Sequence, residues 1–134
     1  MKIKILLVDD QPDFLEPISF VLVAKGYEVL VANNGKQALE LIKSEQPHIV
    51  FLDKQMPIMG GVETLRHLRE FDKEMPVVML TGFPDQESLS EARQLGISGF
   101  FPKRGDLQQL GNIIETILRT HKKLRPPAGE DKDK

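Results

Sequence analysis

The sequence predicts an α/β fold in which one doubly wound sheet of five parallel strands is covered by five helices. Short apolar runs rich in β-branched residues alternate with helix-length segments along the chain, the pattern of repeated strand-helix units. Two of the runs, at residues 49–52 and 77–80, are apolar at every position, as strands buried on both faces are. The length of 134 residues supplies one core of ordinary size.

The first two strands are predicted at residues 3–8 and 28–31, each followed by an amphipathic helix. One face of the first helix carries Ile18, Val21 and Leu22, and one face of the second carries Ala38, Leu39 and Ile42. Gly26 predicts the end of the first helix and Pro47 the end of the second. Pro17 fits the first helix in its first turn, or with a slight kink, because proline has no N–H to donate.

The remaining strands are predicted at residues 48–52, 76–80 and 98–101. Gly60 and Gly61 open the third helix, and Gly96 closes the fourth. The fifth helix carries a long apolar stripe, formed by Leu107, Leu110, Ile114, Ile117 and Leu118. We expect residues 1–122 to form one domain and residues 123–134, which are rich in charge and proline, to form a flexible tail or the stub of a linker.

The composition argues against several classes of function. Lysine and arginine number 18 against 20 aspartate and glutamate residues, and the net charge of −2 does not favour binding to nucleic acids or anionic membranes. Cysteine is absent, so the chain has no disulfide, no thiolate nucleophile and no cysteine-ligated metal, which fits a cytoplasmic protein. The apolar run at residues 3–8 is too short for a membrane anchor and lacks the features of a signal peptide.

Residues that carry a charge or a hydroxyl follow four of the predicted strands at their carboxyl ends. Asp9 and Asp10 follow the first strand, Asp53 the third, Thr81 the fourth and Lys103 the fifth. In an open parallel sheet these strand ends form one rim, where ligands bind, so we expect the five side chains to converge. Three adjacent carboxylates repel one another unless a proton or a cation is present, and oxygen ligands favour Mg²⁺. The backbone carbonyl of Gln55 is a candidate for a further ligand.

Four short segments around these residues carry a resemblance to a known family. They are Val8-Asp9-Asp10, Asp53 with Met56-Pro57-Ile58-Met59-Gly60-Gly61, Leu80-Thr81-Gly82, and Phe100-Phe101-Pro102-Lys103. In this order and on these elements they resemble the signature segments of two-component response-regulator receiver domains. The resemblance implies a flavodoxin-like fold with the strand order 2-1-3-4-5.

The resemblance implies a role in phosphorelay signalling rather than turnover as an enzyme. Asp53 would accept a phosphoryl group from a sensor histidine kinase or a histidine phosphotransfer protein. Asp9, Asp10, Asp53 and the Gln55 carbonyl would bind Mg²⁺. Lys103 would neutralise charge on the transferring phosphoryl group, which is the main contribution a protein makes to this reaction.

The resemblance also implies an output surface and a docking surface. Thr81 would turn toward the phosphoryl group and Phe100 would move inward, changing the face made by the fourth helix, fifth strand and fifth helix. That face would control a downstream protein or an output domain outside this chain, and a phosphorylation-dependent homodimer is left open. Phe14 and Pro17 on the first helix would dock the phosphodonor, with plain core packing as the alternative for Phe14.

Three features depart from the family pattern. Arg104 follows Lys103 where the family usually has proline, so a cis Lys-Pro bond is not available. Phe100 has no hydroxyl, so any switching there acts through packing. Lys54 and Gln55 stand where the family controls the access of water to the acyl phosphate, which leaves the lifetime of that group open.

The main alternative is a receiver-like domain that binds partners without being phosphorylated. A phosphatase of the haloacid-dehalogenase type also uses an aspartate nucleophile with Mg²⁺, but it needs a second aspartate where this chain has Gln55. The acidic loop after the first strand would repel the cofactor phosphate of a flavodoxin-like carrier, and the P-loop motif is absent. His48, His67 and His121 lack metal-binding spacing, and the basic residues at 119–125 fit a helix end better than a nucleic acid site.

Overall fold

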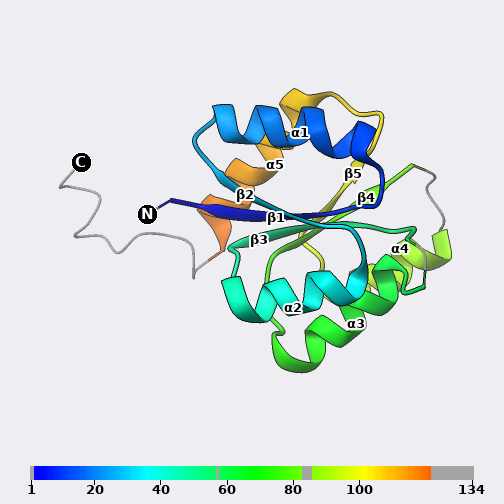
Figure 1. Ribbon diagram of the computed structural model, residues 1–134. Coiled ribbons are helices and arrows are strands. Elements are labelled where there is room, and N and C mark those ends of the chain that lie inside the picture. Colours follow the sequence, from blue (N-terminus) through cyan, green and yellow to red (C-terminus); the bar gives the residue numbers. More distant parts are fainter. Residues whose placement is uncertain (1, 57, 83–85, 122–134) are drawn as a thin grey trace.

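The computed structural model describes residues 2–56, 58–82 and 86–121, and the predicted tail at residues 123–134 lies outside them (Figure 1). Five strands form one parallel sheet: β1 (Lys4–Val8), β2 (Glu28–Ala32), β3 (Ile49–Asp53), β4 (Val77–Thr81) and β5 (Gly99–Pro102). Their order in the sheet is β2-β1-β3-β4-β5. The predicted fold class and strand order are therefore confirmed.

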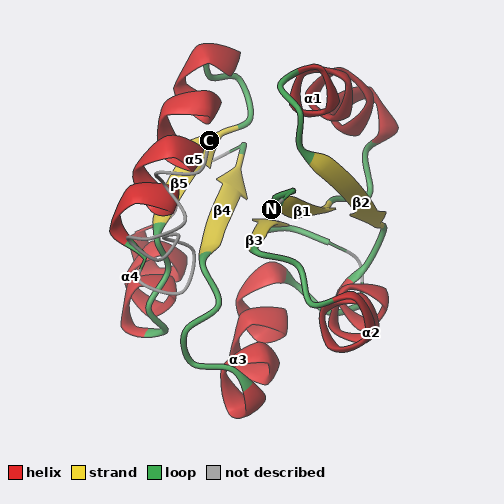
Figure 2. Cartoon of the chain, turned by 90° about the vertical axis from the view of Figure 1, so that its left-hand side faces the viewer, coloured by secondary structure: helices red, strands yellow, loops and turns green. Residues whose placement is uncertain are grey.

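Helices cover both faces of the sheet, as a doubly wound fold requires. One face is covered by α1 (Pro12–Ala24) and α5 (Leu107–Thr120), and the other by α2 (Gly35–Glu45), α3 (Gly61–Phe71) and α4 (Gln86–Gln94) (Figures 1 and 2). None of the helices in the described part of the chain is long and apolar enough to cross a membrane.

The sheet separates two apolar cores because neighbouring residues on a strand point to opposite faces. Ile5 and Leu7 of β1 face the core under α1 and α5, whereas Leu6 and Val8 face the core under α2, α3 and α4. The predicted helical stripes contribute Ile18, Leu22, Leu110, Ile114 and Ile117 to the first core and Ala38 and Ile42 to the second. The central strands are therefore buried on both faces, as their continuous apolar sequences predict.

Pro17 lies inside α1. Because α1 begins at Pro12, Pro17 lies beyond the first turn, so of the two predicted alternatives the first-turn position was wrong and the slight kink stays a prediction. A residue with an N–H at this position would donate to the carbonyl of Asp13, so the proline removes one helical hydrogen bond. Pro12, which takes the first position of the helix, is the proline that fits the first turn.

Four strands, β2 to β5, end one residue later than predicted, and at β3 and β4 the added residue is a candidate site residue. Asp53 and Thr81 were expected just after their strands, but each is the last residue of its strand. Asp53 pairs with Leu80, and Thr81 pairs with Pro102. Parallel pairing therefore continues to the rim of the sheet and fixes the backbone of two candidate site residues.

Candidate functional site

Three carboxylates gather at the carboxyl ends of β1 and β3, as the sequence predicts. These strands are neighbours, with Val8 paired to Leu52, so the residues that follow lie close together. One ligand oxygen from each of Asp9, Asp10 and Asp53 lies within 4.8 Å of the other two. Asp9 is fully buried and Asp53 is 2% exposed, whereas Asp10 is exposed. The cluster is thus partly removed from water and open on one side.

Lys103 brings a positive charge to this cluster from the end of β5. Its backbone N–H donates to the carbonyl of Thr81 at 2.9 Å, which fixes where the side chain starts. Its Nζ atom lies 2.8 Å from Asp9 Oδ2 and 3.1 Å from Asp53 Oδ2. The side chain is only 15% exposed, so water screens these ion pairs less than it would on the surface. Four of the predicted site residues therefore meet in one pocket.

Two carboxylates in the pocket, those of Asp9 and Asp53, repel each other. Burial and the neighbouring charge of Asp9 raise the pKa of Asp53 to about 6, although hydrogen bonds from Gln55 and Lys103 oppose the shift. For Lys103, burial alone would lower the pKa, but the neighbouring carboxylates of Asp9 and Asp53 outweigh burial and raise the pKa. One ammonium group is therefore not enough to make Asp53 as acidic as an ordinary aspartate.

The residues of the pocket fit a hard divalent cation. Asp9 Oδ2 is buried and receives no aligned hydrogen bond from the described residues, although the Lys103 ammonium lies near it. The backbone N–H of Gln55 donates to Asp53 Oδ1 at 3.2 Å, which places Gln55 beside the cluster. Carboxylate and carbonyl oxygens without sulfur or imidazole are the ligands that Mg²⁺ prefers. The acidic cluster is typical of the magnesium site of receiver domains.

A glycine holds the loop after β3 against the pocket. A Cβ atom on Gly61 would collide with the carbonyl oxygen of Asp53, so the start of α3 approaches the strand more closely than any other residue type allows. In the same loop Ile58 has a φ of 72°, a conformation that strains a β-branched residue. The Lys103-Arg104 peptide bond is trans, in accord with the missing proline.

The two predicted switch residues lie on adjacent strands. Thr81 is buried at the end of β4, next to the strand that carries Asp53. Phe100 on β5 is half-buried and packs against the core under α2, α3 and α4. The guanidinium group of Arg93 on α4 lies 5.4 Å from the centre of the Phe100 ring, within cation–π range. Phe100 therefore contacts both the core and α4.

The two predicted docking residues differ in exposure. Pro17 is exposed on α1. Phe14 is half-buried, packs against the core under α1 and α5, and has the Lys103 ammonium 5.2 Å above the centre of its ring. Phe14 thus also contributes to core packing, the alternative that the sequence left open.

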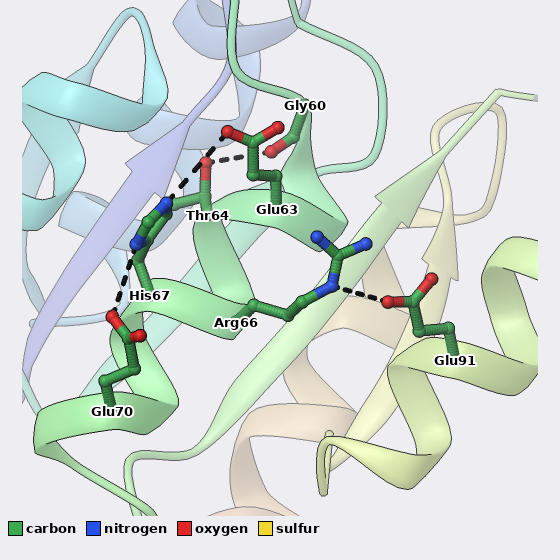
Figure 3. Close-up of polar contacts among 7 residues, drawn as sticks. All are labelled: Gly60, Glu63, Thr64, Arg66, His67, Glu70 and Glu91. Carbon is green, nitrogen blue, oxygen red and sulfur yellow. Dashed lines mark hydrogen bonds and ion pairs between the residues drawn. The ribbon is translucent and has the colours of Figure 1, made fainter.

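The three histidines lie away from the cluster of Asp9, Asp10 and Asp53. His67 lies on the exposed face of α3 between Glu63 at 4.0 Å and Glu70 at 3.3 Å (Figure 3). His48 accepts a hydrogen bond from the backbone N–H of Lys4, and His121 donates one to the carbonyl of Glu74. A hollow of about 520 Å³ near His48 and His121 lies at the amino ends of β3 and β4, opposite the acidic cluster. None of the predicted site residues lines it.

One residue of the pocket was not predicted. The side-chain oxygen of Gln11 accepts a hydrogen bond from Lys103 Nζ at 2.8 Å. Its backbone N–H also donates to Asp9 Oδ1 at 2.9 Å. The only sequence signal for Gln11 is its position next to the aspartate pair, because its partner Lys103 is remote in the chain.

Comparisons with known proteins agree with this geometry. A family model described as "Response regulator receiver domain" matches residues 5–115. Sporulation initiation phosphotransferase F of Bacillus subtilis is 31% identical over 118 residues, which cover 88% of this chain and 95% of that protein. Regulatory protein AtoC of Escherichia coli is 32% identical over 116 residues, which cover 87% of this chain but only 25% of that protein. The chain thus matches nearly the whole of one relative and a part of another.

Solved structures give the same assignment. The crystal structure of a CheY-like response regulator receiver domain protein from Methanospirillum hungatei JF-1 has a TM-score of 0.87 and 26% identity, and the match covers 92% of this chain and 98% of that one. In this chain the acidic cluster and Lys103 lie at the carboxyl rim of the sheet. The chain therefore belongs to the response regulator receiver domain family of two-component signalling.

Proposed function

We propose that Asp53 accepts a phosphoryl group from a phosphohistidine on a sensor histidine kinase or a histidine phosphotransfer protein. A carboxylate oxygen of Asp53 would form the new bond to phosphorus while the phosphorus–nitrogen bond of the donor breaks. The imidazole would leave with the electron pair of that bond and take up a proton. The observation that carries this proposal is the Lys103 ammonium at 3.1 Å from an Asp53 carboxylate that is buried beside a second carboxylate.

Lys103 would serve the reaction through its charge. Its ammonium group favours the ionised form of Asp53, which is the form that attacks phosphorus. After transfer the same group would donate hydrogen bonds to the phosphoryl oxygens, where negative charge collects. Its low exposure makes both effects stronger than they would be on the surface.

Asp9, Asp10, Asp53 and the backbone carbonyl of Gln55 would hold Mg²⁺. When bound, the ion would supply positive charge that offsets the negative charge of the carboxylates and of the phosphoryl group. Asp9 Oδ2 supports this assignment because it is buried and, although paired with Lys103, receives no aligned hydrogen bond from the described residues. Asp9 would bind the ion directly or through a water molecule.

The output of phosphorylation would pass through Thr81 and Phe100. The Thr81 hydroxyl would turn toward the phosphoryl group, and Phe100 would move into the space that it leaves. Because Phe100 packs against both the core and Arg93, its movement would change the face formed by α4, β5 and α5. A downstream protein, an output domain or a second copy of the chain would bind that face.

The phosphodonor would dock on α1 beside the pocket. Pro17 is exposed there, and Phe14 lies near Lys103. The relative Sporulation initiation phosphotransferase F supports a role in phosphotransfer, since its name assigns it one. A cytoplasmic location and a single domain over residues 1–122 remain predictions from the sequence.

The test is phosphorylation of the full chain by acetyl phosphate in the presence of Mg²⁺. The intact mass should increase by one phosphate, and peptide mapping should place it on Asp53. Asp53→Asn should remove the increase, and a chelator should suppress it. A folded protein that gains no phosphate with Mg²⁺ present would instead support the domain that binds partners without phosphorylation.

A further inference from the structure

The Lys103 ammonium lies close to three oxygen atoms from three different residues. They are Asp9 Oδ2 at 2.8 Å, Gln11 Oε1 at 2.8 Å and Asp53 Oδ2 at 3.1 Å. Gln11 Oε1 and Asp53 Oδ2 accept hydrogen bonds from Nζ, whereas Asp9 Oδ2 forms an ion pair with it that lacks hydrogen-bond alignment. Two of the three are carboxylates that the proposed function already uses, whereas the third belongs to a neutral amide with no assigned role.

Gln11 is fixed in a way that leaves its amide free for Lys103. It precedes α1 in the N-cap position with an extended backbone, but its side chain makes no capping hydrogen bond to the helix. Its own backbone N–H donates to Asp9 Oδ1 at 2.9 Å. Gln11 is therefore attached to the carboxylate cluster through its backbone and to Lys103 through its side chain.

The first turn of α1 adds a second contact to Lys103. The ammonium lies 5.2 Å from the centre of the Phe14 ring, within the range of a cation–π interaction. Phe14 is held in turn by the core under α1 and α5. The beginning of α1 thus contacts Lys103 through one neutral oxygen and one aromatic face.

We propose that Gln11 and Phe14 are positioning residues that hold the Lys103 ammonium in the pocket without adding negative charge. A third carboxylate against Lys103 would hold it more tightly, but it would repel an anionic phosphodonor. When a phosphoryl oxygen accepts a hydrogen bond from Lys103 during transfer, the Gln11 oxygen and the Phe14 ring keep the ammonium beside Asp53. The benefit of this positioning for phosphoryl transfer rests on the proposed function. The positioning itself can be measured without phosphorylation.

The positioning is tested by nuclear magnetic resonance of the full chain with ¹⁵N-labelled lysine and without metal. The exchange of the Lys103 ammonium protons with water is measured at low temperature, with exposed Lys36 as the internal reference. Gln11→Met keeps the length of the side chain but removes the oxygen, and exchange should become about threefold to tenfold faster, the range of one hydrogen bond. Phe14→Leu should accelerate exchange by about twofold, as a weak cation–π contact implies.

Two further variants separate positioning from general damage. Gln11→Glu keeps an oxygen acceptor and adds a charge, so Lys103 exchange should be at least as slow as in the wild type, while phosphorylation by acetyl phosphate should slow because of the added negative charge. Gln109→Met removes an exposed glutamine on α5 and should change neither measurement. Gln11→Met should also lower the phosphorylation rate by about threefold to tenfold.

The outcomes distinguish this inference from the proposed function. Unchanged Lys103 exchange in Gln11→Met would overturn the positioning role, whatever the phosphorylation assay shows. If the wild type takes up no phosphate, the proposed function fails, but the exchange data still decide whether Gln11 holds Lys103. Faster exchange in Gln11→Met together with slow exchange in Gln11→Glu would support the inference.

Discussion

Two partly buried cationic side chains lie at opposite ends of the strands, and their surroundings differ in kind. Lys103 lies at the carboxyl rim against two charged carboxylates. Arg69, near the end of α3, lies at the amino ends of β4 and β5 and donates hydrogen bonds to neutral backbone carbonyls. These are the carbonyls of Leu95 at 2.6 Å, Asp72 at 3.0 Å, Met75 at 2.9 Å and Gly96 at 3.1 Å.

The pKa shifts of these two cations have opposite directions. Burial lowers the pKa of Arg69, with a partial offset from Asp72, whereas the carboxylates around Lys103 overcome burial and raise its pKa. Arg69 donates to backbone carbonyls that follow α3, follow α4 and precede β4, so it connects these three segments. Lys103 partly offsets a repulsion that the fold itself creates. The comparison favours a stabilising role for Arg69, whereas the surroundings of Lys103 fit the chemical role proposed for it.

The largest expected effect is on phosphorylation. Lys103→Met should lower the rate of phosphate uptake by Asp53 about a hundredfold or more, because a buried donor to the transferring group is lost. The variant should stay folded, since Mg²⁺ or a proton on Asp53 can replace the missing positive charge. The rate is measured by intact mass against time with acetyl phosphate, and folding by circular dichroism. A folded Lys103→Met that reacts at the wild-type rate would contradict the chemical role.

The opposite result is expected for Arg69. Arg69→Leu should lower the free energy of unfolding by about 2–4 kcal/mol, because four backbone carbonyls lose their hydrogen bonds at a partly buried site. Denaturant titration measures this loss, and Arg69→Lys should recover part of it. Phosphate uptake by the folded fraction should not change. A stable Arg69→Leu variant would mean that water replaces the guanidinium group at little cost.

The pH dependence of stability sharpens the same contrast. The pKa of Asp53 is about 6 in the folded, metal-free protein against an ordinary value of 3.8, so the fold binds this proton more tightly than the unfolded chain does. The stabilisation from the proton is complete below the ordinary value and is lost as the pH rises through about 6.

Asp53→Asn cannot titrate at this position and supplies the measurement. Between about pH 4 and about pH 7.5 its unfolding free energy should gain about 1–3 kcal/mol relative to the wild type, without metal. Mg²⁺ should reduce the difference because it stabilises only the wild-type carboxylate. A difference that stays constant over this pH range would show that Asp53 ionises normally.

The strands and the acidic pocket were predictable because they depend on patterns that are local in the sequence. Buried parallel strands need continuous apolar runs, and the carboxyl rim of such a sheet collects whatever follows each run. Asp9, Asp53 and Lys103 could therefore be placed together although they are far apart in the chain. The one-residue extension at Asp53 and Thr81 was not predictable because pairing, rather than hydrophobicity, decides where a strand ends.

Gln11 and Arg69 escaped prediction for a different reason. The partner of Gln11 is 92 positions away, and only the approach of α1 to the end of β5 brings the two together. The partners of Arg69 are backbone carbonyls, which every residue has, so no sequence pattern marks them. The first-turn alternative for Pro17 failed because α1 begins at Pro12, which leaves Pro17 more than one turn into the helix.

The smallest effect is expected from a third cation, which tests whether burial causes the contrast. Arg66 lies one turn before Arg69 on α3 and forms an ion pair with Glu91 of α4 at 2.6 Å, but the two side chains are 53% and 40% exposed (Figure 3). Water and salt screen such a pair, so Arg66→Gln should leave the denaturation midpoint close to that of the wild type. Glu91→Gln and the double variant complete the cycle and isolate the pairwise contribution. A coupling as large as the loss from Arg69→Leu would mean that the bond between α3 and α4, and not burial, is what makes Arg69 important.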